Sequence, residues 1–527
     1  MRTGWRSRLA SGTERRALAG RPGLLLAAAG GGLAALAHPP FGVLPGLLGF
    51  ALALHALDAA PAHRPWRSAF ARGWAAGFAY FLVGLWWVAE AFFVDAETYG
   101  WMAPFAVVLL PAGLALFWGA AALAYRRLAP ESPRRVLVFA ALFALAEWLR
   151  GHVLTGFPWD LPGEAWKAGS APSQAAAFLG AYGLSVVTLA IAAAPAALLG
   201  PGSRLGKGLA VGAAVLTLAG LWAQGAARLA SARPETTNLM VRVVQPDIPQ
   251  SLKWSPEAFR AIVERHAALT AAPAARRPDV VVWSEAAIPT PIEYVLAPET
   301  WTRDRVLGSL KPGQTLLAGV VRQEGPLYYN SLLALRRTEA GFTPLALYDK
   351  HRLVPFGEFL PLSELLGRVG FKKLVAVESE FAAGGAPAPI APEGLPPLQP
   401  LICYESLFPG FAAGSGVRPA WIVNVSNDAW FGRTSGPLQH LNIASYRAIE
   451  EGLPMVRATP TGVSAFIDPW GRTLAALPRA ADGSEGAVLD HALPAPAPPT
   501  FYSRWRDLPF WALTLAGLAC ALGRRRR

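Results

Sequence analysis

The chain has little of what an ordinary soluble protein is built from. Only 16% of its 527 residues are charged, whereas soluble domains average about 25%. Negatively charged residues are the scarcer kind: the chain has 35 Asp and Glu but 48 Lys and Arg, which gives a net charge of +13. Two cysteines exclude a disulfide-stabilised scaffold. Hydrophobic residues make up 53% of the chain, which excludes a disordered protein and argues against a fully soluble one.

The few charges are unevenly spread. Residues 1–230 hold 27 of the 83 charged residues, and the remainder of the chain holds 56. This contrast predicts a membrane domain over 1–230, a soluble domain over 231–500, and a final span with a basic tail over 501–527. A membrane-spanning helix needs about 20 mostly apolar residues. Eight segments fit, at about 22–38, 42–58, 70–93, 101–125, 135–150, 175–199, 207–227 and 507–523.

Basic residues gather in alternate loops between these segments, and cytoplasmic loops are the ones enriched in Lys and Arg. With eight spans, all basic loops and both termini fall on the cytoplasmic side, so that residues 231–505 lie outside the cytoplasm. Because the positive charge sits beside membrane spans, we expect no nucleic-acid binding. The basic residues are Arg2, Arg6, Arg8, Arg15, Arg16, Arg21, Arg64, Arg67, Arg126, Arg127, Arg134, Arg204 and Arg524 to Arg527.

One loop on the outer side is rich in aromatic residues. Residues 151–174 contain the run Gly156-Phe157-Pro158-Trp159-Asp160. Tryptophan is enriched at membrane–water interfaces. The loop is therefore interpreted either as a simple interfacial anchor or as a wall of a cavity that faces lipid.

From about residue 238 short β-branched runs alternate with helical patterns, which predicts an α/β domain. Helices are expected over 256–272 and 438–451, a loop over 383–399, and a linker over 494–500. Residues 464–477 read as a hairpin. Strands are expected at 241–244, 280–283, 316–321, 332–335, 400–402, 421–425, 464–467 and 472–477.

Three reactive side chains stand at predicted strand ends, where a rigid sheet can aim them. Glu285 follows Val-Val-Val-Trp-Ser, and partial burial there would raise its pKa toward that of a useful base. Lys350 opens a charged segment that reaches Glu358, and an ammonium can stabilise an oxyanion. Both residues also have an ordinary interpretation. Glu285 could be a surface glutamate, and Lys350 could belong to a solvated charged loop, although apolar neighbours argue against that interpretation of Lys350.

Cys403 follows the apolar pair Leu401-Ile402. A thiolate is a strong nucleophile that readily forms thioesters, whereas a lone cysteine after an apolar run is often a buried, inert thiol. The other cysteine, Cys520, falls in the last span and is expected to be inert. Among histidines, His351 and His440 are the candidate partners for a Cys–His pair, but neither stands in a recognisable motif.

Other chemistries lack their motifs. The chain has no Gly-x-Ser-x-Gly with a following triad, no His-Glu-x-x-His, and no Cys-x-x-Cys. It also has no glycine-rich phosphate loop, so neither ATP nor NAD is implied. We therefore expect no metal and no cofactor.

The order Glu285, Lys350, Cys403 resembles the catalytic triad of the nitrilase superfamily. Longer motifs resemble one membrane-bound branch of it, the apolipoprotein N-acyltransferases, as does the layout of seven spans, a nitrilase-like domain and one final span. The resemblance covers nearly the whole chain. The motifs are His38 to Gly42, Gly156 to Trp159, Val244 to Trp254, Trp283 to Pro289, Lys350 to Pro361, Cys403 to Glu405 and Asn427 to Gly432.

The resemblance implies a polytopic α-helical membrane domain joined to an α-β-β-α sandwich, in the bacterial inner membrane with the catalytic domain in the periplasm. It implies transfer of a phospholipid acyl chain, typically from phosphatidylethanolamine, to the N-terminal diacylglyceryl-cysteine of a lipoprotein. Cys403 would be the nucleophile, Glu285 the general base and Lys350 the oxyanion stabiliser. The family positions that support the site or bind substrate would be Glu358, Trp254, Tyr404, Glu405 and Trp430.

Two other functions remain open at the level of sequence. A membrane-tethered amidase would use the same triad with water as the second nucleophile, but eight spans exceed what an anchor needs. A degenerate, non-catalytic assembly protein would be expected to lose at least one of the three triad residues, and all three are present.

Overall fold

The computed structural model describes residue 18 and residues 20–61, 64–233, 235–359, 381–411, 416–478 and 485–522. The basic residues of the two termini, up to Arg16 and from Arg524, and the Leu360-Pro361 end of one motif lie outside these ranges. The chain divides into two compact units. The first, helical unit comprises the chain up to Ser231, Arg433–Tyr446 and the residues from Thr500 onward, and the second, sheet unit comprises Ala232–Gly432 and Arg447–Pro499.

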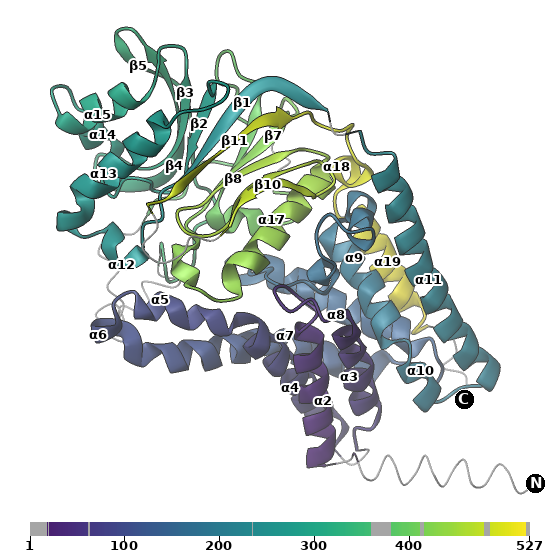
Figure 1. Ribbon diagram of the computed structural model, residues 1–527. Coiled ribbons are helices and arrows are strands. Elements are labelled where there is room, and N and C mark those ends of the chain that lie inside the picture. Colours follow the sequence, from purple (N-terminus) through teal and green to yellow (C-terminus); the bar gives the residue numbers. More distant parts are fainter. Residues whose placement is uncertain are drawn as a thin grey trace, which may run out of the picture. The chain divides into compact units, whose positions relative to one another are not determined.

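The helical unit is made of apolar helices joined by short 3₁₀ turns (Figure 1). Five stretches are long and apolar enough to cross a membrane: Pro65–Phe93, Ala96–Leu128, Arg135–Thr155, Pro172–Ala193 and Arg204–Ala230. Its described helices are α2 (Arg21–Ala35), α3 (Gly49–Asp58), α4 (Pro65–Leu85), α5 (Glu90–Phe93), α6 (Ala96–Tyr99), α7 (Ala103–Leu128), α8 (Arg135–His152), α9 (Ala176–Ala193), α10 (Ala196–Leu199), α11 (Arg204–Ala230), α18 (Phe501–Trp505) and α19 (Leu508–Ala519).

Every segment predicted to span the membrane contains a helix. Three of these helices are short: α2 has 15 residues, α3 has 10 and α19 has 12. A stretch of 12 residues rises about 18 Å, less than the hydrocarbon core of a bilayer. A helical apolar region with several candidate spans is thus confirmed, while the number of eight spans stays a prediction.

Small residues let these helices approach closely, as is usual between membrane helices. A Cβ atom on Gly31 of α2 would lie 1.9 Å from the carbonyl oxygen of Ala76 on α4, so only glycine allows this contact. Trp118 of α7 is fully buried and packs against Phe81 and Phe143. The close packing explains why a unit so rich in alanine and glycine still has a buried core.

The aromatic run 156–160 after α8 is mostly buried, which argues against its interpretation as a simple interfacial anchor. Trp159 is only 2% exposed, and its ring packs 4.6 Å from that of Trp87. Both indole N–H groups donate to the side-chain oxygen of Gln439, at 3.0 and 2.9 Å. Asn442, one turn further along the same helix, α17 (Gly436–Glu451), bonds the backbone of Ala168 and Glu164. The loop is therefore a packed part of the helical unit.

The sheet unit holds two sheets of mixed strand direction (Figure 1). The first has the order β11-β1-β2-β3-β4-β5, in which β1, β2 and β3 run parallel and the other pairs are antiparallel. These strands are β1 (Thr236–Gln245), β2 (Val280–Trp283), β3 (Thr315–Glu324), β4 (Leu327–Thr338), β5 (Gly341–Asp349) and β11 (Ala487–Pro494).

The second sheet has the order β10-β9-β8-β7-β6, with β6, β7 and β8 parallel. Its strands are β6 (Leu398–Ile402), β7 (Trp421–Val425), β8 (Met455–Ala458), β9 (Ser464–Ile467) and β10 (Thr473–Leu477). Because β6 begins at Leu398, the loop predicted over 383–399 ends two residues too late. Strand β5 was predicted only by its end before Lys350, and strands β8 and β11 were not predicted, since they mix polar or small residues into a short run.

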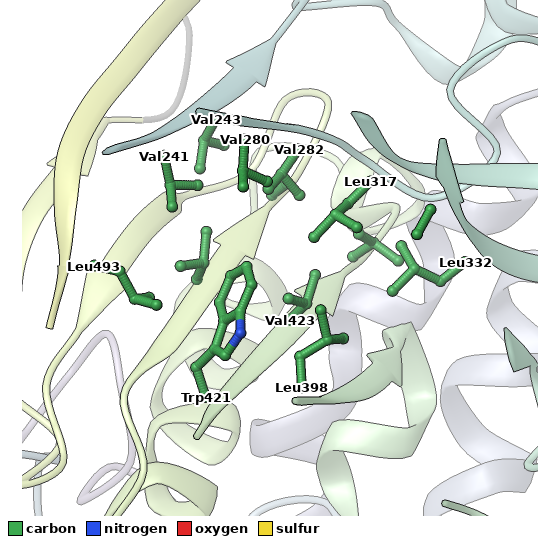
Figure 2. Packing of buried hydrophobic residues seen from close by; sticks show 14 of the residues in the cluster. Val241, Val243, Val280, Val282, Leu317, Leu332, Leu398, Trp421, Val423 and Leu493 are labelled. Atoms are coloured by element: carbon green, nitrogen blue, oxygen red, sulfur yellow. The ribbon is translucent and has the colours of Figure 1, made fainter. Parts of the chain in front are cut away.

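One apolar core joins the two sheets (Figure 2). Val241, Val243 and Val280 of the first sheet point toward Trp421 and Val423 of the second, and all five are fully buried. Alternation along a strand sends the intervening residues to the other face, where Val244, Val281 and Trp283 form a second cluster with the helices of that side. Those helices are α13 (Pro256–Ala271), α14 (Ile292–Val295) and α15 (Trp301–Ser309).

Candidate active site

The candidate site lies at the carboxyl ends of strands from both sheets. Glu285 follows β2 and Lys350 follows β5, which runs parallel to β2 because two antiparallel pairings separate it from β3. Cys403 follows β6, and residues 426–428 follow its parallel neighbour β7. The three residues of the predicted triad thus all stand directly beyond strand ends, as the sequence indicates.

The two predicted glutamates share one lysine. The Lys350 Nζ atom lies 3.1 Å from Glu285 Oε1 and 2.8 Å from Glu358 Oε1. The side-chain amide of Asn330 donates to the same two oxygens, at 2.6 and 3.0 Å. The second oxygen of Glu358 accepts from the Val354 backbone N–H at 2.8 Å, which holds the loop after β5.

Charge pairing keeps Glu285 and Lys350 ionised although both are buried. Burial by itself would raise the pKa of Glu285, but Lys350, the Asn330 amide and Lys253 outweigh it and lower that pKa. Burial likewise disfavours the charged form of Lys350, yet Glu285 and Glu358 raise its pKa above the usual value. A carboxylate that is ionised beside a permanent cation can accept a proton from a neighbouring acid.

Cys403 sits in a strained turn. Its φ angle is +48°, a left-handed conformation that is rare for residues other than glycine, and such strain clusters at active sites. Burial, followed by the charge of Glu285, raises the pKa of the Cys403 thiol to about 12, although Lys350 and a side-chain hydrogen bond with Ser426 act in the opposite direction. The thiol is therefore protonated at neutral pH and needs a base before it can attack.

Glu405 ties the nucleophile turn to the segment that carries Lys350. It is fully buried, and one oxygen accepts from the Ile402 backbone N–H at 2.8 Å. The other accepts from the Tyr348 hydroxyl at 2.8 Å and from the backbone N–H groups of His351 and Arg352. Burial raises the pKa of Glu405 to about 7. This position is a structural support, because its oxygens are occupied by protein donors.

The three predicted aromatic residues differ in exposure. Tyr404 is buried and packs edge-on against Phe408 at 5.2 Å. Trp254 is 52% exposed and Trp430 is 39% exposed. The indole rings of Trp254 and Trp430 are therefore open to an apolar partner, whereas the ring of Tyr404 is enclosed by the protein.

A buried ion pair supports the strand ends of the second sheet. Arg457 of β8 binds Asp428 at 2.6 Å, and neither side chain is exposed. Arg457 also donates to Asn424, whose amide bonds the Leu401 carbonyl at 2.8 Å, two residues before the nucleophile. The Ser426 hydroxyl, which contacts Cys403, donates to Asp428 at 2.7 Å. This chain of contacts fixes both the strand that carries Cys403 and the hydroxyl beside its sulfur.

Sequence reasoning missed three residues that form the site. Asn330 was overlooked because β4 was expected to begin at Leu332, although an asparagine next to an apolar strand is an unusual signal. Lys253 was passed over in favour of Trp254, yet its Nζ atom is buried and donates to the Glu285 carbonyl at 3.1 Å. A Cβ atom on Gly319 of β3 would lie 2.6 Å from the Cα atom of Glu285, so glycine is needed there.

Comparison with known proteins identifies the relatives of this chain. Residues 30–194 match the model of the apolipoprotein N-acyltransferase N-terminal domain, and residues 240–494 match that of carbon-nitrogen hydrolases. An apolipoprotein N-acyltransferase of Caulobacter vibrioides is 56% identical over 504 residues, covering 94% of this chain and 93% of that protein. The chain belongs to the apolipoprotein N-acyltransferase family. Members from Allorhizobium ampelinum and Rhodopseudomonas palustris are each 38% identical, and cover 96% and 95% of this chain and the same shares of their own lengths.

Membership of the apolipoprotein N-acyltransferase family confirms the resemblance read from the motifs. The expected combination of an apolar helical region with a carbon-nitrogen hydrolase domain is confirmed as well, and it marks the chain as a membrane-embedded enzyme. Within the described residues, no group of three or more His, Cys, Asp and Glu side chains is arranged to hold a metal ion.

Proposed function

We propose that this enzyme transfers an acyl chain from a membrane phospholipid, phosphatidylethanolamine in the first instance, to the α-amine of the N-terminal diacylglyceryl-cysteine of lipoproteins. One observation carries the proposal. Glu285 and Lys350 lie 3.1 Å apart at one sheet edge, and both act electrostatically on the sulfur of Cys403 in its strained turn. Relatives of nearly equal length are named for N-acylation of apolipoproteins.

In the first half-reaction Glu285 takes the thiol proton of Cys403, and the sulfur attacks the ester carbonyl carbon of the donor. A C–S bond forms while the carbonyl electrons move to oxygen, and Lys350 stabilises this oxyanion. When the intermediate collapses, the ester C–O bond breaks and the departing lysophospholipid oxygen takes the proton back from Glu285. The acyl chain remains on Cys403 as a thioester.

In the second half-reaction the lipoprotein amine attacks the thioester carbonyl and Glu285 accepts the amine proton. The C–S bond breaks, the thiolate is protonated by Glu285, and an amide is released. The carboxylate serves both halves because Lys350 keeps it ionised between them. Glu358 holds that lysine, with 2.8 Å between its Oε1 atom and Nζ, and the Asn330 amide donates to both Glu358 and Glu285.

The location of the reaction follows from its substrates. Acyl chains leave lipid only at a cost of about 0.8 kcal/mol per CH₂ group, so both substrates must be met at the bilayer. We place the enzyme in the bacterial inner membrane with both termini in the cytoplasm and residues 231–505 in the periplasm. Five long apolar helices and the exposed rings of Trp254 and Trp430 support this assignment.

The acyl-enzyme tests donor and nucleophile together. Purified enzyme in detergent is mixed with phosphatidylethanolamine, and its intact mass is expected to rise by one acyl group. A synthetic diacylated lipopeptide added afterwards should remove that mass and appear as triacylated product, whereas release of free fatty acid would point to an amidase-like hydrolase instead. The Cys403→Ala protein should gain no mass, and Cys520→Ser should behave like wild type. Acylation of lipopeptide by Cys403→Ala would refute the scheme.

A further inference from the structure

The buried charges of the proposed catalytic cluster do not balance with one lysine. Glu285 and Glu358 both bind Lys350, at 3.1 and 2.8 Å, and the side chains of all three are at most 11% exposed. Two carboxylates and one ammonium leave one negative charge without a counter-charge. An unpaired charge is costly to bury, and the cost grows when Cys403 must also become a thiolate.

Lys253 is placed to supply the missing positive charge. It is 3% exposed, at the end of the short helix α12 (Gln250–Lys253). Its Nζ atom donates to the Glu285 carbonyl at 3.1 Å, and its ammonium interacts with both the Glu285 carboxylate and the Cys403 sulfur. An ammonium has three N–H groups, so this hydrogen bond leaves Lys253 with further donor capacity.

Building on the proposed acyl transfer, we propose that Lys253 is the second cation of the catalytic cluster. It acts as a positioning residue that holds the Glu285 turn through its carbonyl and stabilises the negative charge that moves onto sulfur. When Glu285 takes the thiol proton, the S–H bond breaks and the charge passes from the carboxylate to Sγ. Because Lys253 faces both atoms, its ammonium remains paired before and after the transfer.

The groups that face Lys253 come from three elements: Glu285 after β2, Cys403 after β6, and His266 on α13, which is itself close to the charge of Arg265. His266 cannot replace Lys253 as the cation, because burial lowers its pKa to about 4 and leaves it neutral. Arg265 is directed to the carbonyls of Pro246 and Asp247. Burial lowers the pKa of Lys253 itself to about 8, although Glu285 acts against this.

The test follows acyl-enzyme formation in a single turnover between pH 6 and pH 10, with phosphatidylethanolamine in detergent micelles and intact mass as the readout. In wild type the rate should fall as pH rises through about 8, because Lys253 loses its charge. Lys253→Arg keeps its charge and should show no such fall, with a rate at pH 7 within about tenfold of wild type. Lys253→Met should be at least tenfold slower at pH 7 and show no fall near pH 8. The exposed Lys311→Met is the matched control and should follow wild type.

A fall near pH 8 that persists in Lys253→Arg would overturn the proposal, as would a Lys253→Met protein that reacts at the wild-type rate. If Lys253→Met does not fold, judged by its thermal unfolding, the arginine variant still decides. A second measurement separates this proposal from the proposed function. This measurement is the alkylation of Cys403 by iodoacetamide in a Cys520→Ser background, which needs no lipid. Lys253→Met should slow alkylation about tenfold, even if the wild-type enzyme forms no acyl-enzyme. An unchanged alkylation rate would refute the role of Lys253.

Discussion

Glu285→Gln should change two rates at Cys403 in opposite directions. The thiol pKa of about 12 means that about one molecule in 10⁵ carries a thiolate at pH 7. The carboxylate of Glu285 is one cause of that high pKa, and removing a neighbouring charge typically shifts a pKa by about 1–3 units. Alkylation of the free thiol should therefore become about 10 to 1,000 times faster. Acyl-enzyme formation should become about 10² to 10⁴ times slower, because the proton acceptor is gone.

Both rates can be read by intact mass on the same protein. Iodoacetamide reports the thiolate and phosphatidylethanolamine reports acylation, in a Cys520→Ser background so that one thiol remains. Glu339→Gln, at an exposed position of the same unit, is the matched control and should leave both rates unchanged. If Glu285→Gln slowed both reactions equally, the substitution would have damaged the site, and a wild-type rate of acylation would exclude Glu285 as the base.

Three further outcomes follow from the packing. Gly319→Ala should abolish acyl-enzyme formation, measured by intact mass, because the new Cβ atom would lie 2.6 Å from the Cα atom of Glu285. Gly308→Ala is the control: it lies in open space on a helix and should stabilise the protein by up to about 1 kcal/mol in thermal unfolding. Trp254→Ala and Trp430→Ala should slow turnover of long-chain donors more than short-chain ones while leaving the melting temperature unchanged; equal turnover with wild type would remove both from the site. Arg457→Met leaves the buried carboxylate of Asp428 without its cation and should lower the free energy of unfolding by about 3–5 kcal/mol. A decrease below about 1 kcal/mol would contradict the importance of this ion pair.

The strands that position the site could be predicted because they are continuous apolar runs. Val280–Trp283 and Trp421–Val425 are fully buried and have the predicted bounds. The reactive residues were predicted to follow strand ends, and because parallel strands end at one edge, Glu285 and Lys350 lie 3.1 Å apart there. Cys403 could be singled out by its place after β6, whereas no local pattern reveals its positive φ angle or the hydrogen bond of Glu405 to the neighbouring Ile402.

The residues that sequence reasoning missed owe their roles to distant partners. Lys253 is one residue from an exposed tryptophan, and its burial becomes evident only when α12 lies against the Glu285 turn. Trp159 is a residue type that is common in interfacial anchors. Its indole N–H nevertheless donates a hydrogen bond to Gln439, 280 residues further along the chain. A polar side chain or an indole ring is equally suited to solvent and to a buried hydrogen bond, so local sequence cannot decide between them.

The arginines of the helical unit show which residues the positive-inside rule should count when it is used to predict membrane orientation. Arg72, Arg135 and Arg150 fall within predicted spans and are each at most 2% exposed. Arg72 donates to the carbonyls of Ala56 and Leu18, and the other two pair with Asp58 and Glu147.

Arg150 also donates to the carbonyls of Phe157 and Trp159, so its charge holds the aromatic loop in place. These three residues therefore serve packing, and counting them in the loops would blur the asymmetry between the two sides of the membrane. The exposed Arg64, Arg67 and Arg204 have no such structural duty among the contacts of the described residues. Charges of that exposed kind are the ones the positive-inside rule counts, so the predicted orientation depends on them and not on the total charge of the unit.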